Sequence, residues 1–314
     1  MNRLIKKISV FAMPFIIASI FLEVRLSQIP TYLSLKKYYL ESQLDQIEVL
    51  STGLSYGNSI NPQFFDHKAF NLFNDAEDFY YDTKVIEKYV DQMKKLKLII
   101  LPISYYSLDL REEIGPWAER TRFYNLIFGI PPSLLLSRFD PSFYSYLFAY
   151  GWLDVRNFIF NNFTNQMKNV MYSNGWREVG LKGLLETNET ERAGLQSVDF
   201  FDYNFTNKQN VSFNLNLLSV FIEKCQKRRI QIILFTPPTY HFFYDKIDPE
   251  KYQNMQDSIE QISNRFKLKY YNFFNDNRFG SEDFYTSDHV NNLGAEKLSR
   301  IMNDIVNETL AQQD

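Results

Sequence analysis

Residues 230–235 read Ile230-Gln231-Ile232-Ile233-Leu234-Phe235, an almost continuous run of apolar, largely β-branched side chains. Leu98–Ile103 shows the same pattern, beginning Leu98-Ile99-Ile100-Leu101. Such runs are typical of strands that are covered on both faces, as in a parallel sheet between two layers of helices. Three weaker runs complete the predicted sheet: Ile47–Ser51, Ala69–Phe73 and Tyr270–Phe274.

Helical patterns separate these strands. Four segments repeat apolar residues with a period near 3.6: Asp82–Leu96, Asn214–Lys227, Tyr252–Phe266 and Leu293–Leu310. Strands that alternate with amphipathic helices predict an α/β fold with a parallel sheet. We therefore expect a flavodoxin-like, three-layer α/β/α domain over residues 46–314.

The alternation lapses over residues 105–212, where Phe, Tyr, Trp and Asn are concentrated. This pattern predicts a helical, aromatic-rich insertion. We expect it to cap the carboxyl edge of the sheet, where ligands of open α/β sheets bind. Its polar part, Asn188–Asn210, is predicted to be a loop.

The composition excludes several classes of function. A net charge of −3 and an isoelectric point near 5.8 argue against a nucleic-acid-binding protein. The single cysteine, Cys225, excludes an internal disulfide and a cysteine-based zinc site, and its helical surroundings predict a buried thiol. Three scattered histidines and the lack of a phosphate-binding loop predict neither a metal nor a cofactor. The oligomeric state is left open.

The N-terminus carries a membrane signal. Arg3, Lys6 and Lys7 precede the mostly apolar run Ile8–Leu22. We expect residues 1–27 to form an uncleaved anchor, with the N-terminus in the cytoplasm and the remainder outside. A cleaved signal peptide and an amphipathic helix docked on the domain are the alternatives. Residues 28–45 are predicted to form a juxtamembrane helix or stalk.

A candidate nucleophile follows the first predicted strand. Ser55 lies in Gly53-Leu54-Ser55-Tyr56-Gly57, where the glycines permit a tight turn that exposes a side chain. Ser51 and Ser59 compete, but Ser51 falls within the predicted strand and Ser59 lies further along the turn. A serine also needs a base within hydrogen-bonding reach.

The candidate base is one of three histidines. His67 lies in a charged stretch that is predicted to be exposed, and His241 follows a strand and could contact a ligand. His289 lies in a loop just before the last predicted helix, which favours it as the partner of Ser55.

These residues resemble the SGNH/GDSL hydrolases. Gly53-Leu54-Ser55-Tyr56 matches the first motif of that family, and His289 with Asn291 and Gly294 matches its last, His-x-Asn-x-x-Gly. Further segments resemble a bacterial, membrane-anchored branch similar to the D-alanyl transfer and alginate acetylation proteins: Ser59-Ile60-Asn61-Pro62, Ala69-Phe70-Asn71-Leu72 and Tyr80-Tyr81-Asp82. The resemblance covers about residues 46–106 and 228–310.

The chain departs from the family at three positions. Thr286 stands three residues before the histidine, where the family has its aspartate. Asp288 is the candidate third member of the triad, but neighbours on an extended segment point in opposite directions, so Asp283 is the alternative. The second motif lacks its glycine and the third its asparagine. The candidate oxyanion donors are therefore Gly53, Asn74 and Ser104.

The resemblance implies an extracytoplasmic serine esterase or O-acyltransferase that transfers an acyl group, most simply acetyl, on a cell-surface polysaccharide. The missing motif residues support an alternative hypothesis. In that case the protein has kept the fold, lost the chemistry, and binds glycan or assists envelope assembly.

Overall fold

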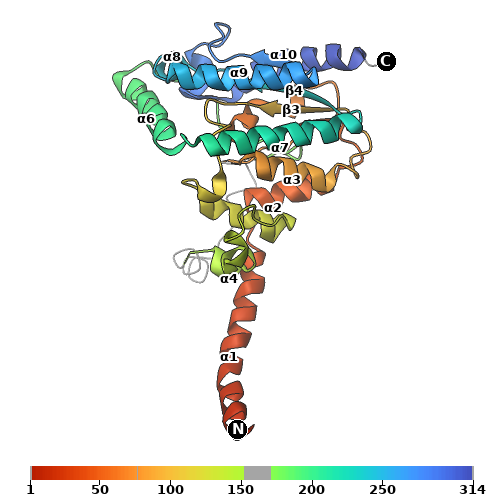
Figure 1. Ribbon diagram of the computed structural model, residues 1–314, viewed down its shortest axis with the longest axis vertical. Coiled ribbons are helices and arrows are strands. Elements are labelled where there is room, and N and C mark those ends of the chain that lie inside the picture. The colour runs from red at the N-terminus through yellow and green to blue at the C-terminus, as the bar shows by residue number, and fades with distance from the viewer. Residues whose placement is uncertain (1, 76, 152–170, 313–314) are drawn as a thin grey trace.

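The computed structural model describes residues 2–75, 77–151 and 171–312 (Figure 1). Five strands form one parallel sheet in the order β2-β1-β3-β4-β5. Their bounds are β1 Val49–Ser51, β2 Ala69–Asn71, β3 Leu98–Pro102, β4 Gln231–Thr236 and β5 Lys269–Asn272. This is the flavodoxin-like strand order, so the predicted α/β fold is confirmed.

Helices cover both faces of this sheet. Their bounds are α3 Phe79–Tyr89, α7 Lys208–Lys227, α9 Pro249–Phe266 and α10 Asn292–Ala311. Because side chains alternate along a strand, Ile99 and Leu234 pack with α3, α7 and α9 on one face. Ile100 and Ile233 pack with α10 on the other face. Figure 1 shows α3 and α7 side by side in the layer opposite α10.

The insertion consists of short helices followed by one long helix. The short elements are η3 Glu112–Ile114, η4 Ala118–Thr121, η5 Tyr124–Phe128, η6 Ser137–Phe139, η7 Pro141–Phe143 and α4 Tyr146–Ala149. The long element is α6, Asn188–Asn204, which contacts α8, His241–Tyr244. Residues 152–170 of the predicted insertion lie outside the described residues.

The predicted loop over Asn188–Asn210 is wrong, because α6 occupies most of it. Thr187 caps this helix through a reciprocal pair of hydrogen bonds with Thr190. Although most residues of α6 are polar, the helix has a narrow apolar face, on which Val198 and Phe201 are buried. Packing of this face compensates for the low helix propensity of its many polar residues.

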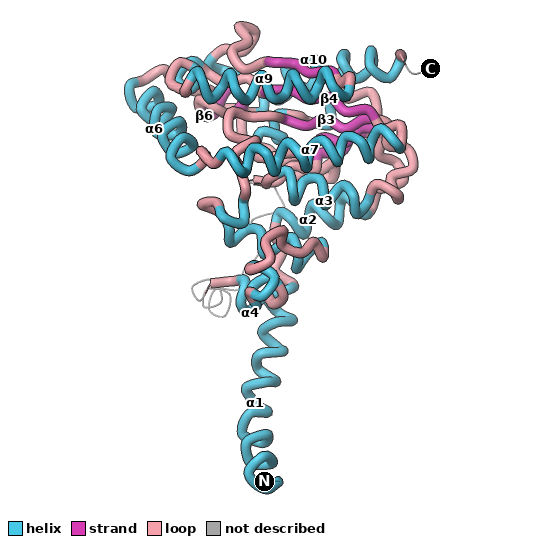
Figure 2. Tube along the Cα trace, viewed as in Figure 1, coloured by secondary structure: helices cyan, strands magenta, loops and turns pink. Residues whose placement is uncertain are grey.

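Two helices precede the sheet. Helix α1, Asn2–Ser27, projects from the domain (Figure 2), and its segment Ile5–Ser27 is long and apolar enough to cross a membrane. Helix α2, Tyr32–Glu41, places Leu33 and Leu40 in the domain core. Of the two alternatives for residues 28–45, a helix or a stalk, the structure has a helix, and its apolar side chains are packed in the domain core.

Candidate active site

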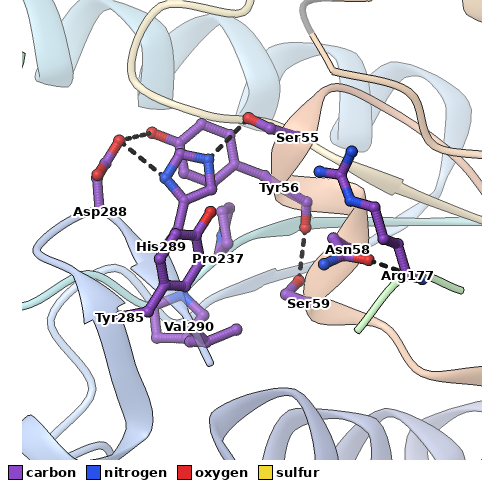
Figure 3. A pocket seen from close by; sticks show the side chains of 11 residues that line it. Ser55, Tyr56, Asn58, Ser59, Arg177, Pro237, Tyr285, Asp288, His289 and Val290 are labelled. Atoms are coloured by element: carbon purple, nitrogen blue, oxygen red, sulfur yellow. Dashed lines mark hydrogen bonds and ion pairs between the residues drawn. The ribbon is translucent and has the colours of Figure 1, made fainter. Parts of the chain in front are cut away.

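The carboxyl ends of the strands carry the candidate nucleophile. Ser55 follows β1 and begins a 3₁₀ helix, η1, Ser55–Ser59. The turn before it requires glycine: Gly53 has φ +109°, and a Cβ there would lie 2.3 Å from the side chain of Pro102. This turn points the Ser55 side chain toward His289 (Figure 3).

The structure brings Ser55, His289 and Asp288 together (Figure 3). The Ser55 Oγ lies 2.7 Å from His289 Nε2, and His289 Nδ1 lies 3.0 Å from Asp288 Oδ2. With Nδ1 protonated toward Asp288, Nε2 accepts the hydrogen bond of the Ser55 hydroxyl. Ser55, which lies 234 positions from His289 in the sequence, thus forms one hydrogen-bonded relay with the adjacent pair Asp288 and His289.

The expectation that Asp288 points away from His289 is wrong. Strands β6, Phe284–Thr286, and β7, His289–Val290, are antiparallel, and Asp288 lies in the tight turn between them. The alternation of side chains holds along an extended strand and not through such a turn. Asp283, the alternative, instead binds Lys297 and accepts the backbone N–H of Gly280 at 3.0 Å.

Two hydroxyls hold the Asp288 carboxylate. Thr286 Oγ1 donates to Oδ1 at 2.9 Å, and the Tyr56 hydroxyl donates to Oδ2 at 3.2 Å. The Tyr56 ring also stacks on the His289 imidazole, with centroids 4.4 Å apart. Thr286 and Tyr56 thus fix the orientation of the Asp288 carboxylate.

The pKa values of His289 and Asp288 are each set by opposing effects. Burial lowers the pKa of His289, but the charge and hydrogen bond of Asp288 outweigh it and raise that pKa above its usual 6.5. Burial raises the pKa of Asp288, but His289 and the hydroxyls of Thr286 and Tyr56 bring it below its usual 3.8. Asp288 is therefore ionised, and His289 is a stronger base than free histidine.

The competing residues lie elsewhere or are engaged. The Ser59 hydroxyl donates to the Tyr56 carbonyl at 2.7 Å, and Ser51 is buried in β1. His67 pairs with Glu48, and His241 pairs with Asp245. Of the three histidines, only His289 contacts Ser55.

The motif residues after His289 have structural roles. Asn291 caps α10 by accepting the backbone N–H groups of Leu293 and Gly294, and its amide donates to the Glu282 carbonyl. A Cβ at Gly294 would lie 2.3 Å from the Asp283 carbonyl oxygen. Together they hold the hairpin that carries Asp288 and His289 tightly against α10.

None of the three predicted oxyanion donors offers its polar group to the site. The Gly53 N–H donates to Asp82 Oδ1 at 3.0 Å, and the Asn74 amide donates to the Tyr124 hydroxyl at 2.9 Å. Ser104 is buried, with its hydroxyl 2.7 Å from that of Ser107. These groups instead stabilise the loops that follow β1, β2 and β3.

Tyr106 is a residue that the sequence argument missed. Its side chain lines the same cleft as Ser55 and His289, and its ring stacks on Phe201 of α6. Burial and the charge of Asp288 raise the pKa of Tyr106, so the hydroxyl keeps its proton. Tyr106 follows β3, in the stretch 103–107 where the family asparagine was sought.

Arg177, from the insertion, was also missed. Its guanidinium faces the pocket beside Ser55 (Figure 3) and forms a bidentate ion pair with Asp75, at 2.5 and 2.7 Å. Its backbone N–H donates to Asn58 Oδ1, and the neighbouring Trp176 indole donates to the Asn58 carbonyl. An isolated arginine far along the sequence gave no signal of this contact.

The turn before Arg177 gives a testable prediction. Gly175 has φ +80°, and a Cβ there would lie 2.1 Å from the Asn71 carbonyl oxygen. Gly180 also has a positive φ, +102°, but has nothing within 4 Å of such a Cβ. Both alanine variants should lose about 1–2 kcal/mol to backbone strain. Gly175→Ala should lose about 1–3 kcal/mol more to the clash, measured by thermal melts. Equal losses would contradict this placement of the turn.

Ser55 and His289 lie between two hollows. An open cleft of about 600 Å³ lies on one side and is lined by Tyr106, Trp117, Arg120, Gln196 and Phe200. A small pocket of about 10 Å³ lies on the other and is lined by Arg177, Pro237 and Val290. The small pocket has room for about one water-sized group.

Comparisons with known proteins gave only distant structural matches. No protein-family model and no curated protein matches the chain. A crystal structure of a "putative acylhydrolase" from Bacteroides fragilis aligns with a TM-score of 0.44 and 10% identity, over 87% of this chain and 96% of that one. A GDSL-like lipase from Bacteroides thetaiotaomicron aligns with a TM-score of 0.41 and 11% identity, over 90% and 100%. The case for an activity therefore depends on the site residues themselves.

Proposed function

We propose that the protein is a membrane-anchored serine esterase or O-acyltransferase of the SGNH type. The observation that carries the proposal is the continuous relay from Ser55 Oγ through His289 to Asp288, with contacts of 2.7 and 3.0 Å. A serine activated by a base, with a third group orienting that base, is the arrangement used in nucleophilic acyl transfer.

The mechanism has two half-reactions. Ser55 Oγ attacks the ester carbonyl while His289 Nε2 takes the hydroxyl proton, and Asp288 stabilises the imidazolium that forms. When the tetrahedral intermediate collapses, the leaving alcohol receives that proton from His289. Water or an acceptor hydroxyl then attacks acyl-Ser55 with His289 again as base, which gives hydrolysis or transfer.

Two donors serve the oxyanion in this proposal. Ser55 is the first residue of η1. The first backbone N–H groups of a helix have no partner within that helix, and the Ser55 N–H is one of them. The Tyr106 hydroxyl is protonated and lies beside the Ser55 side chain. The Arg177 guanidinium adds positive charge at the edge of the pocket, partly neutralised by Asp75.

The hollows support a small acyl group on a glycan. The pocket of about 10 Å³ beside Ser55 has room for a group no larger than an acetyl methyl group. The open cleft combines the aromatic rings of Trp117 and Phe200 with the polar Arg120 and Gln196. Aromatic faces beside hydrogen-bonding groups suit a sugar ring, which is apolar on its faces and polar at its rim.

Contacts between the end of α1 and the domain support a permanent membrane anchor. Leu26 is fully buried against the domain, and Glu23 accepts hydrogen bonds from Tyr146 and Leu147, so the end of α1 is part of the folded structure. Arg3 precedes the candidate span Ile5–Ser27, and Lys6 and Lys7 lie in its first turn. These cations at the N-terminal end favour a cytoplasmic N-terminus and an extracytoplasmic domain. A cell-surface polysaccharide is the matching partner.

Labelling with a fluorophosphonate tests the nucleophile. The detergent-solubilised full chain should gain one adduct by intact mass, and Ser55→Ala should gain none. Ser59→Ala is the matched control, because its hydroxyl lies in the same helix but donates to the Tyr56 carbonyl, and it should label like the parent. Labelling that persists in Ser55→Ala would overturn the assignment.

A second candidate function rests on the aromatic cleft alone. Trp117 and Phe200 lie 5.4 Å apart between ring centroids and would bind a glycan without any chemistry at Ser55. Acetylated glycan that binds both the parent and Ser55→Ala, with no adduct and no ester hydrolysis in either, would favour this non-catalytic function.

A further inference from the structure

A group of exposed apolar side chains lies on the insertion near the C-terminal end of α1, where that helix meets the domain. We define the apolar collar as Leu135, Leu136, Phe139, Tyr144 and Phe148. All five are more than half exposed, and Leu136 is 85% exposed. Five large apolar side chains this exposed between residues 135 and 148 of a folded domain are typical of an interaction surface.

The collar is fixed to α1 by one acidic residue. The Glu23 carboxylate accepts hydrogen bonds from Ser145 Oγ at 2.7 Å and from the backbone N–H groups of Tyr146 and Leu147 at 2.7 and 2.9 Å. It thereby caps α4, which carries Phe148. Figure 2 shows α4 beside α1 at the end of the domain from which α1 projects.

Further bonds connect the collar to itself and to the insertion. The Tyr144 hydroxyl donates to the Arg138 carbonyl at 3.1 Å, which ties η7 to η6. The Tyr146 hydroxyl donates to the Leu126 carbonyl at 3.3 Å. The collar residues therefore keep a set position along the axis of α1.

The length of α1 places the collar at a membrane boundary. A hydrocarbon core of about 30 Å needs about 20 helical residues at 1.5 Å each. Counted from Ile5, where the candidate span begins, such a core ends near Val24. Glu23, which holds the collar, therefore lies where α1 leaves the hydrocarbon. In this part of α1 the domain covers one side of the helix: Leu22 and Glu23 are half-buried and Leu26 is buried, while Val24 and Arg25 stay exposed.

We infer that the apolar collar is seated in the interfacial layer of the lipid bilayer that α1 crosses. Leu, Phe and Tyr side chains suit this layer, and the exposed cations Arg25, on α1, and Arg138, next to Phe139 in the sequence, suit lipid phosphates. The inference rests on the proposed anchoring by α1 and not on the chemistry of Ser55. A single span leaves a domain free to tilt, whereas this contact holds the substrate cleft at a set height and orientation.

Depth-dependent fluorescence tests this inference on the full chain. Leu136→Cys and Phe148→Cys are labelled with an environment-sensitive dye and reconstituted in vesicles of equal parts phosphatidylcholine and phosphatidylglycerol. The native Cys225 is buried, and burial raises its pKa to about 12, so it stays unlabelled. The matched control is Tyr203→Cys, at an 87% exposed position on α6.

Both collar probes should shift to the blue and lose most of their emission to lipids spin-labelled near the headgroup, while the control responds only to aqueous iodide. If the protein co-floats with vesicles but the collar probes behave like the control, the inferred contact between collar and bilayer is wrong and the proposed anchoring stands. If the protein does not co-float with vesicles, both the contact and the anchoring are wrong. Collar probes shielded from both quenchers would show that a second copy or another protein covers the surface, which also overturns the inference. Circular dichroism matching the parent establishes that each variant is folded.

Discussion

Replacement of Asp288 by Asn is expected to lower kcat for an activated ester such as p-nitrophenyl acetate by about 10⁴-fold, because loss of the orienting acid in a serine triad has this order of effect. Asparagine keeps the size of the side chain but cannot stabilise an imidazolium. Its amide also favours the wrong tautomer of His289, since Nδ1 would then accept rather than donate.

The same variant should change the pH profile. Catalysis needs neutral His289, so the parent loses activity as the pH falls through the His289 pKa, which Asp288 holds above 6.5. Without that charge, burial remains and lowers the pKa. The acidic limb of Asp288→Asn should therefore move to lower pH, measured by the rate of fluorophosphonate labelling from pH 4 to 9.

Asp283→Asn is the matched control for this prediction. Asp283 lies in the same segment and is buried, but its carboxylate binds Lys297 and the Gly280 N–H. Its loss should lower stability and leave the acidic limb in place. An unchanged limb in Asp288→Asn, or an equal shift in Asp283→Asn, would show that Asp288 does not act on His289.

The sequence predicted those features best that depend on local composition and on the order of residues along the chain. The apolar run at residues 98–101 lies in β3, and the run at residues 230–235 lies in β4 except for Ile230, because strands buried on both faces are mostly apolar. The pairing of Ser55 with His289 also followed from their positions after the first strand and before the last helix. Both depend on local composition and chain order, which a sequence displays directly.

The remainder of the site depends on turns and long-range contacts. The position of Asp288 follows from the tight turn between β6 and β7, a hairpin too short to show a strand pattern. Tyr106 and Ser104 are two residues apart after β3, and only the packing of Tyr106 on Phe201 settles which of them faces Ser55. Arg177 reaches the site because its hairpin is bonded to Asn58, a contact that spans 119 positions.

A buried polar network below the site links α2 to the nucleophile turn. Lys36 is fully buried, and burial lowers its pKa to about 7, opposed mainly by the charge of Glu77. Its ammonium donates to the Phe73 carbonyl and lies over the Phe73 ring, directly before the loop that holds Asp75. Asp82 in the same network accepts from Gly53 at 3.0 Å. Helix α2, which follows the candidate span in α1, thus supports the backbone that presents Ser55.

Tyr106→Phe is expected to lower kcat by about 10²–10³-fold, the usual effect of removing one oxyanion donor. The ring that stacks on Phe201 is retained, so only the hydroxyl beside Ser55 is lost. Because this hydroxyl is proposed to bond the oxyanion of the intermediate and not the ester itself, KM should change little. Kinetics with p-nitrophenyl acetate separate the two constants.

Tyr105→Phe provides the matched control for Tyr106→Phe. The Tyr105 hydroxyl donates to Asp202 at 2.7 Å and accepts the Asp248 N–H at 3.0 Å, so its removal affects packing away from Ser55. We expect lower thermal stability with kcat near that of the parent. If both variants kept the parental kcat, the Ser55 N–H and the Arg177 charge would have to stabilise the oxyanion without Tyr106. The family asparagine would then have no functional replacement after β3.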